Sequence, residues 1–249
     1  MSKKLYRDCI AALEALMEPY IQQTLSLPME ELEKLQKSDR DFTFLHGLAI
    51  FTRDPKVIRD QLVAVLLAGR DTTAATMSWC LYELSAYPEK YARLRREVLE
   101  VVGRSEAPTY QTLKDLKYLR FTIQETLRLY PAVPVNVKMA LKDTTLPATA
   151  KSGGPVGVCK GDVVAWGPLL VQLRRDLYPA TSDEFADPHV FSPERWYVWQ
   201  PKPWEYVPFN GGPRVVRPLP LLSLIPWLVP ALPPPLLLLV SADITRHIH

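Results

Sequence analysis

The chain has 249 residues, 47% hydrophobic and 23% charged, which is ordinary for a folded protein with room for one large domain or two small ones. A formal net charge of +3 is too small to indicate a nucleic-acid partner or binding to an anionic membrane surface. Three scattered cysteines, Cys9, Cys80 and Cys159, form no C-x-x-C pair, which excludes a disulfide framework and a cysteine zinc site and suits a reducing compartment. Charges are mixed through the first 20 residues, so we expect neither a signal peptide nor a membrane anchor there.

The first half of the chain is predicted to be helical. Apolar residues at helical spacing predict a helix over residues 4–25. Residues 30–37 are expected to form a short charged helix or a linker, and residues 41–51 another short helix. Asp54 and Pro55 are a capping carboxylate and a first-turn proline, and no other proline occurs before Pro88. One helix should therefore run over 54–87, roughly 50 Å long at about 1.5 Å per residue. Because charges interrupt it, we expect the central helix of an α-rich domain and not a membrane span.

Shorter elements of both kinds are predicted in the second half. A helix is expected over 88–102 and another that closes before Pro131, while β-branched runs over 133–143 and 156–167 predict strands. A brief helix over 168–176 precedes a stretch, 178–214, that is rich in proline, aspartate and aromatic residues and has little periodicity. We interpret that stretch as an ordered meander. The expected fold class is mainly α with a small β part.

Two helical motifs could carry chemistry, and each has an ordinary structural alternative. Gly69 costs about 1 kcal/mol in a helix interior, so the helix could loosen there and leave Asp71 beside Thr72 as a short proton relay. The alternative is a packing glycine with polar neighbours that face water. Glu125 and Arg128 lie three residues apart and could pair on one helix face. The alternative is a surface ion pair worth about 0–1 kcal/mol.

Two further motifs lie in the meander. Arg195, in Pro-Glu-Arg-Trp, could reach a buried carboxylate such as Glu125, or it could belong to an exposed charged loop. The stretch Phe-Asn-Gly-Gly-Pro-Arg at 209–214 could let the backbone approach a flat ligand, with Arg214 holding a carboxylate or phosphate, or it could be a plain glycine turn. No G-x-G-x-x-G, G-x-S-x-G or H-E-x-x-H motif occurs in the chain.

The order of these motifs is more specific than any one of them. A-G-x-D-T-T, E-T-L-R, P-E-R-W and F-N-G-G-P-R, in that order over about residues 41–214, resemble the cytochrome P450 family of haem-thiolate monooxygenases, most closely the fungal group that hydroxylates n-alkanes and fatty acids. The resemblance implies the C-terminal half of the P450 fold around one long helix, with haem as the cofactor. It also implies an apolar small-molecule substrate, an NADPH-dependent cytochrome P450 reductase as electron donor, no nucleic acid and, for full-length members, the endoplasmic reticulum membrane.

The resemblance also implies roles for individual residues. The catalytic residues, which deliver protons during oxygen activation, would be Asp71 and Thr72. A structural triad that locks the core would comprise Glu125, Arg128 and Arg195. The cofactor-binding residues would be Ala68, Gly69, Lys138 (where the family usually has arginine), Phe209, Gly212 and Arg214. The apolar residues lining the substrate pocket would be Leu66, Val133 and Val135, with Pro134 between the last two.

The chain departs from the family at the cofactor loop. The pattern F-x-x-G-x-R-x-C-x-G, counted from Phe209, places a cysteine at 216 and a glycine at 218, but this sequence has Val216 and Pro218. The axial thiolate is therefore missing, and no metal ligand is expected. Residues 218–240 are uncharged and long enough to span a bilayer, but their prolines forbid a continuous helix. We interpret 215–249 as an aberrant tail from out-of-frame or intron-derived translation, or from a decayed gene.

The expected organisation is a helical lead-in at 1–40, a partial P450 domain at 41–214 and the aberrant tail at 215–249. The family's N-terminal half and its anchor have no counterpart in these residues, so Met1 could be internal to a longer gene. Two functions stay open. One is a fragment of a haem monooxygenase that is inactive as written, and the other is a non-catalytic helical protein or pseudogene product.

Overall fold

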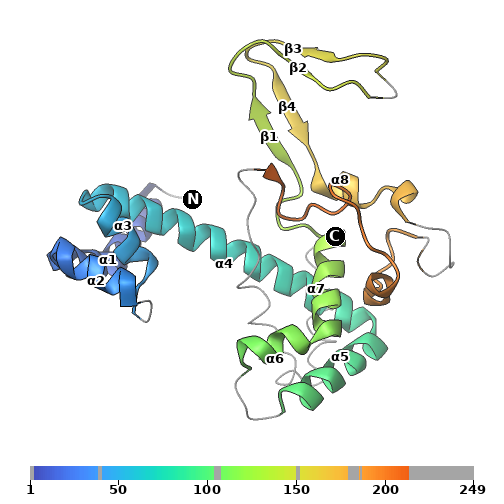
Figure 1. The fold of residues 1–249 in the computed structure, drawn as a ribbon, viewed down its shortest axis with the longest axis horizontal. Coiled ribbons are helices and arrows are strands. Elements are labelled where there is room, and N and C mark those ends of the chain that lie inside the picture. Colours follow the sequence, from blue (N-terminus) through green and yellow to red (C-terminus); the bar gives the residue numbers. More distant parts are fainter. Residues whose placement is uncertain are drawn as a thin grey trace. The chain divides into compact units, whose positions relative to one another are not determined.

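The computed structural model describes residues 3–38, 41–103, 108–149, 152–178, 185 and 187–212. The expectations about Arg214, Val216 and the tail at 215–249 lie outside these residues. The described chain is mainly helical with two small two-stranded sheets (Figure 1), which confirms the predicted fold class. It divides into two compact units with the boundary between Asp71 and Thr72.

The first unit contains α1 (Lys3–Ser26), α2 (Met29–Ser38), α3 (Phe44–Phe51) and the beginning of α4. Thr43 starts α3 with a capping box, in which its hydroxyl accepts from the His46 backbone N–H and its own N–H donates to the His46 ring at 3.1 Å. Arg53 donates to the carbonyls of Leu25 and Leu27 and so holds the end of α1. The buried core of this unit is shared by all four helices and consists of Met17, Ile21, Leu32, Ala49 and Ile58.

The long helix α4 (Pro55–Ala86) is unbroken, as the sequence predicts for 54–87. Its first turn is capped by the Asp54 carboxylate, which accepts from the Lys56 N–H at 2.9 Å. It ends where Pro88 opens the next helix, because a proline disfavours helical backbone at the residue before it. In the part of the chain that the structure describes, no helix is long and apolar enough to cross a membrane.

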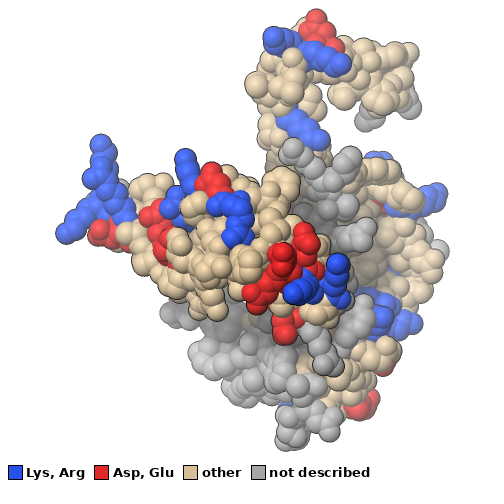
Figure 2. All heavy atoms as spheres, turned by 60° about the vertical axis from the view of Figure 1, so that its left-hand side comes forward, with Lys and Arg blue, Asp and Glu red and all other residues tan. Residues whose placement is uncertain are grey.

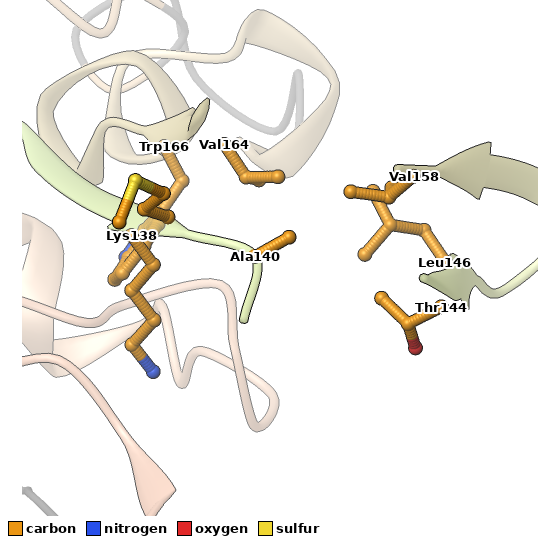
Figure 3. Close-up of a pocket in the computed structure, with 8 residues that line it drawn as sticks. Lys138, Ala140, Thr144, Leu146, Val158, Val164 and Trp166 are labelled. Carbon is orange, nitrogen blue, oxygen red and sulfur yellow. The ribbon is translucent and has the colours of Figure 1, made fainter. Parts of the chain in front are cut away.

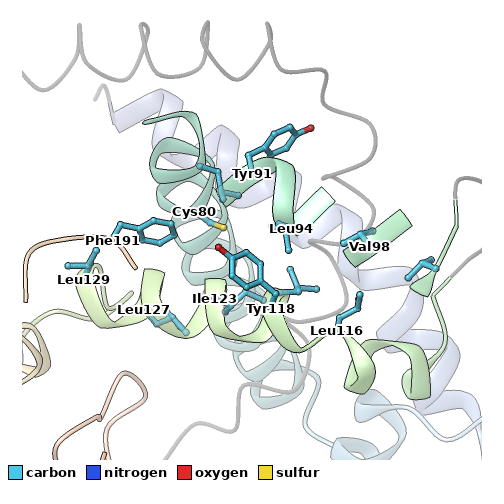
Figure 4. Close-up of a cluster of buried hydrophobic side chains, with 13 residues drawn as sticks. Cys80, Tyr91, Leu94, Val98, Leu116, Tyr118, Ile123, Leu127, Leu129 and Phe191 are labelled. Atoms are coloured by element: carbon cyan, nitrogen blue, oxygen red, sulfur yellow. The ribbon is translucent and has the colours of Figure 1, made fainter. Parts of the chain in front are cut away.

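The core of the second unit forms where α4 meets α5 (Pro88–Val101) and α7 (Lys117–Leu129), with the short α6 (Tyr110–Asp115) leading into α7 (Figure 4). The core side chains labelled in Figure 4 are Cys80, Tyr91, Leu94, Val98, Leu116, Tyr118, Ile123, Leu127, Leu129 and Phe191. Burying one large aliphatic or aromatic side chain stabilises a fold by about 1.5–3 kcal/mol. The apolar contacts among the three helices therefore stabilise this unit.

Two antiparallel ribbons follow α7. Strand β1 (Asn136–Met139) pairs with β4 (Val163–Trp166), and β2 (Thr144–Leu146) pairs with β3 (Val156–Val158). Strands β1, β3 and β4 lie within the runs that predict strands, whereas β2 begins just after the first run and was not predicted. Figure 1 shows β1 rising from the end of α7 and β4 leading down into α8 (Pro168–Gln172). The chain then makes a short 3₁₀ turn at Arg175–Leu177, enters the meander, and makes a second 3₁₀ turn at Pro193–Tyr197.

Charged side chains of both signs are interspersed over the face drawn in Figure 2. This mixing agrees with the small formal net charge of +3. A surface with both signs interspersed gives no strong single-sign field.

Candidate functional site

A carboxylate and a guanidinium are buried together on α7. Glu125 and Arg128 lie three residues apart on the inner face of the helix, and both side chains are 0% exposed. Arg128 donates from Nε to Glu125 Oε2 at 2.8 Å and from Nη2 to Oε1 at 2.9 Å. Two parallel bonds of this kind make the strong, bidentate form of the arginine–carboxylate pair.

The meander brings a second arginine to the same carboxylate. Arg195, in the second 3₁₀ turn, is buried and places its Nε 3.4 Å from Glu125 Oε1. The Ser192 N–H donates to the same oxygen at 2.9 Å, and the Trp196 ring N–H donates to Oε2 at 3.0 Å. The structure therefore brings together Glu125, Arg128 and Arg195, inside the protein and not as a surface ion pair or an exposed loop.

The remaining donors of the two arginines hold the meander. Arg128 donates to the carbonyls of Pro188 at 2.6 Å and Val190 at 3.2 Å, and Arg195 donates to Asp187 O at 3.0 Å and also to Val190 O. Burial lowers the pKa of Arg195. Burial also acts to lower the pKa of Arg128, but its bonds to Glu125 outweigh that effect and raise it. Both groups stay charged because an arginine pKa lies far above neutrality.

Gln172 is a buried link that the sequence patterns did not indicate. Its amide nitrogen donates to the carbonyls of Leu127 and Arg128 at 3.0 and 3.1 Å, at the end of α7. Its amide oxygen accepts from the Val207 N–H at 2.9 Å. One side chain from α8 therefore ties the last turn of α7 to the backbone just before Phe209. No local motif could reveal this, because the partners are 35 to 45 residues away in sequence.

The glycine-rich stretch is tied to the β1–β4 ribbon. Asn136 and Asn210 exchange two amide hydrogen bonds of 3.1 and 3.2 Å, and the Trp166 ring N–H donates to Asn210 Oδ1 at 3.2 Å. Asn210 and Gly212 both have positive φ, 61° and 79°. These contacts fix the backbone that follows Phe209. Asn136 and Trp166 are further residues that sequence reasoning missed, whereas Asn210 lies in the stretch that it had singled out.

Lys138 lies on the same ribbon. Its side chain is exposed, and its ammonium lies 5.3 Å from the centre of the Trp166 ring. It also borders a cavity of about 430 Å³ between β1–β4 and β2–β3 (Figure 3). The cavity is lined by Lys138, Met139, Ala140, Thr144, Leu146, Val158, Val164 and Trp166. Val133 and Val135, expected in the substrate pocket, are exposed and do not line this cavity.

The middle of α4 is exposed in this structure. The Asp71 side chain is 72% exposed, with its carboxylate 4.0 Å from Arg70 Nε. Leu66, Ala68 and Gly69 are exposed as well, while Thr72 is half-buried. Among the described residues, no atom lies within 4 Å of the position that a Cβ on Gly69 would take, so close packing does not explain the glycine. The helix does not loosen here, and the catalytic roles of Asp71 and Thr72 stay a prediction.

These features occur in the order that is typical of the cytochrome P450 fold, and comparison with known proteins agrees. The cytochrome P450 family profile matches residues 1–215, so the chain belongs to the cytochrome P450 family. It is 51% identical over 217 residues to cytochrome P450 monooxygenase pvhE of Talaromyces variabilis, covering 86% of this chain and 40% of that protein. It is 42% identical over 219 residues to cytochrome P450 52A1 of Candida tropicalis, covering 84% of this chain and 38% of that protein.

A third relative, cytochrome P450 52E1 of Candida apicola, is 41% identical over 221 residues and covers 85% of this chain and 40% of its own length. The chain therefore spans about two fifths of the length of the curated relatives that it matches. The profile also extends over residues 1–40, which the motif pattern did not include.

The family implies haem held by a cysteine thiolate, and the sulfur donors of this chain do not fit that ligand. Position 216 holds a valine, which has no lone pair. Cys80 lies in the helical core, where burial raises the pKa of its thiol to about 12. Cys9 and Cys159 are exposed, on α1 and after β3, and neither belongs to the loop at 209–214. Among the described residues, no group of three histidine, cysteine or acidic side chains could hold a metal ion.

Proposed function

We propose that this chain is a fragment of a cytochrome P450 whose whole protein hydroxylates an apolar substrate of the alkane or fatty-acid class with O₂. The observation that carries the proposal is the buried contact of Glu125 with Arg128 and Arg195, in a chain that also keeps the order of the family's motifs. The relatives named cytochrome P450 52A1 and 52E1 support the choice of subgroup.

The residues assigned by the family pattern take their roles within this proposal. Asp71 and Thr72 would hold and deliver protons, with Ala68 and Gly69 beside them on α4. Lys138 and Arg214 would bind the acidic groups of the cofactor, at the loop formed by Phe209 and Gly212. The apolar side chains of Leu66, Val133 and Val135 would contact the substrate. The whole protein would take electrons from an NADPH-dependent reductase and lie at the endoplasmic reticulum membrane.

We also propose that the sequence as written is not itself a hydroxylase. A thiolate supplies the electron density that favours O–O cleavage, and Val216 stands where the family pattern requires the cysteine. The three thiols elsewhere in the chain do not compensate, since one is buried in the helical core and two lie on other elements. The valine at position 216 is also the observation that supports the second candidate function, a non-catalytic helical protein.

The test compares two chimeras, each with the N-terminal part of cytochrome P450 52A1 placed before this chain. One keeps Val216, and the other carries Val216→Cys and Pro218→Gly. After reconstitution with haem and reduction, carbon monoxide should give the red-shifted Soret band of a thiolate ligand only with the cysteine. The cysteine chimera should then hydroxylate a fatty acid.

Each half of the proposal has its own contrary result. A thiolate-type band from the Val216 chimera, or from this chain alone, would show that the missing cysteine does not prevent ligation. A cysteine chimera that gives the band but converts neither alkane nor fatty acid would contradict the proposed substrate class.

A further inference from the structure

Glu83 is a buried carboxyl that lies apart from the arginine cluster. It belongs to the last turns of α4, and only 7% of it is exposed. Its hydrogen bond comes from Tyr130, whose hydroxyl donates to Oε1 at 2.5 Å from 47 residues away in sequence. Because burying a carboxyl without a hydrogen-bond partner costs free energy, this bond stabilises the contact between Glu83 and Tyr130.

The same turn of α4 also receives the ring of Tyr130. Trp79 stacks on that ring with centroids 4.2 Å apart and planes only 4° from parallel. Trp79 and Glu83 are four residues apart and therefore lie on one face of the helix. α4 thus holds Tyr130 at two points, by its ring and by its hydroxyl.

Tyr130 stands where α7 ends and a short connecting segment begins. Its N–H closes the last turn on Thr126 O at 2.7 Å, and it is followed by buried Pro131. The segment 131–135 then enters β1, whose first residue is tied to Asn210. Two of its five residues are prolines with restricted φ, so the segment is short and stiff between two anchors.

The side chains that this segment presents are apolar and open. Val133 is 42% and Val135 is 54% exposed. The backbone between them is close to the end of β4, since a Cβ on Gly167 would lie 3.3 Å from Pro134 O. Because the segment has little freedom of its own, the position of Tyr130 determines where Val133 and Val135 lie.

The geometry points to Glu83 and Trp79 as positioning residues that fix Tyr130 and thereby aim Val133 and Val135 at the substrate. The inference rests on the proposed function for the substrate-facing role of the two valines, and it adds the residues that set how an apolar chain meets them. Neither Glu83 nor Trp79 would touch the substrate.

We call the contacts of Tyr130 with Glu83 and Trp79 the Tyr130 anchor. Its contribution to stability should depend on pH, because Glu83 can be protonated. Burial raises the pKa of Glu83, while the Tyr130 hydrogen bond opposes that rise. The other charged groups that act on it are Glu125 and Arg128 on α7 and Lys90 on α5. The titratable groups Cys80, on α4, and Tyr87, between α4 and α5, also lie near it. Removing the Tyr130 hydroxyl should raise the pKa of Glu83 further, so the loss of stability should be larger at pH 8 than at pH 5.

The experiment measures amide hydrogen exchange of residues 132–136 in this chain and in Tyr130→Phe. Tyr118→Phe is the matched control, because Tyr118, in the first turn of α7, likewise donates its hydroxyl hydrogen bond to a glutamate, Glu194, at 2.7 Å. Tyr130→Phe should speed exchange in the segment about tenfold, the effect of losing one hydrogen bond to a charged group. Glu83→Gln, which keeps an acceptor for the hydroxyl, should stay within about threefold of the parent chain.

Equal exchange in Tyr130→Phe and Tyr118→Phe, or a stability loss independent of pH, would overturn the anchor. The substrate role is read in the cysteine chimera, where Tyr130→Phe should raise KM for the fatty acid more than it lowers kcat. An unchanged KM in an active chimera would refute the positioning role while the proposed function stands. A chimera that gives a thiolate band but no turnover refutes both the proposed function and the substrate role. In that case the hydrogen-exchange data alone decide whether Glu83 and Trp79 hold Tyr130.

Discussion

Glu125→Gln is the change that tests whether the buried cluster holds the second unit together. The carboxylate accepts from Arg128, Arg195, Ser192 and Trp196, and it is fully buried. A neutral amide leaves two guanidinium groups without their counter-charge and turns an NH₂ group toward other donors. Breaking a buried ion pair by removing one partner costs about 3–5 kcal/mol. Since domains are stable by only about 5–15 kcal/mol, this loss should leave the unit marginal.

Urea unfolding followed by tryptophan fluorescence measures this loss in the right part of the chain. All six tryptophans come after the unit boundary at residue 72, at positions 79, 166, 196, 199, 204 and 227. With a slope of about 1–3 kcal/mol per M, the midpoint should fall by more than about 1 M.

The matched control is Asp176→Asn, which removes a carboxylate that also pairs with an arginine, Arg174, but in solvent. Its midpoint should not change. If Glu125→Gln shifts the midpoint no further than this control does, the reasoning from burial is wrong.

Three further predictions concern single side chains. In the native protein, a disulfide reagent should react with the exposed thiols of Cys9 and Cys159 but not with Cys80, because burial raises the pKa of the Cys80 thiol to about 12. Gly211→Ala should speed chymotryptic cleavage after Trp204, because the added Cβ would lie 2.6 Å from Cη2 of the Trp204 ring and displace it. Burial acts to raise the pKa of Glu194, but the Tyr118 hydrogen bond and nearby cations outweigh it and lower the pKa. Tyr118→Phe should therefore destabilise the protein at pH 7, and its deficit in unfolding free energy should shrink below about pH 4.

Local signals in the sequence predicted the helices well. Asp54 and Pro55 begin α4 and Pro88 ends it, because capping and the restrictions around proline act over a few residues. The ladder partners of the strands could not be predicted, since β1 pairs with β4 and not with β2, its neighbour along the chain. Alternation in a strand shows which residues share a face, but it says nothing about the partner.

The site was predictable only where motif order supplied what spacing cannot. Glu125 and Arg128 share a helix face by periodicity alone, but the contact with Arg195 joins residues 70 apart, and the family resemblance is what suggested it. The pair of Glu83 and Tyr130 has no motif at all. Its hydrogen bond depends on the crossing of two helices, which no local pattern encodes.

The buried cluster of Glu125, Arg128 and Arg195 does not depend on the residue at position 216, where the family pattern has its haem ligand. Every donor to Glu125 that the structure shows comes from α7 or from the meander up to Trp196, before the loop at 209–214 begins. Gln172 reaches the backbone at Val207, and Asn136 holds Asn210, so the loop is also positioned by contacts that precede residue 214. A valine at 216 removes the sulfur donor without removing any of these bonds. The sequence therefore keeps the family's buried framework and the order of its motifs, while position 216 holds a valine where the family pattern has a cysteine.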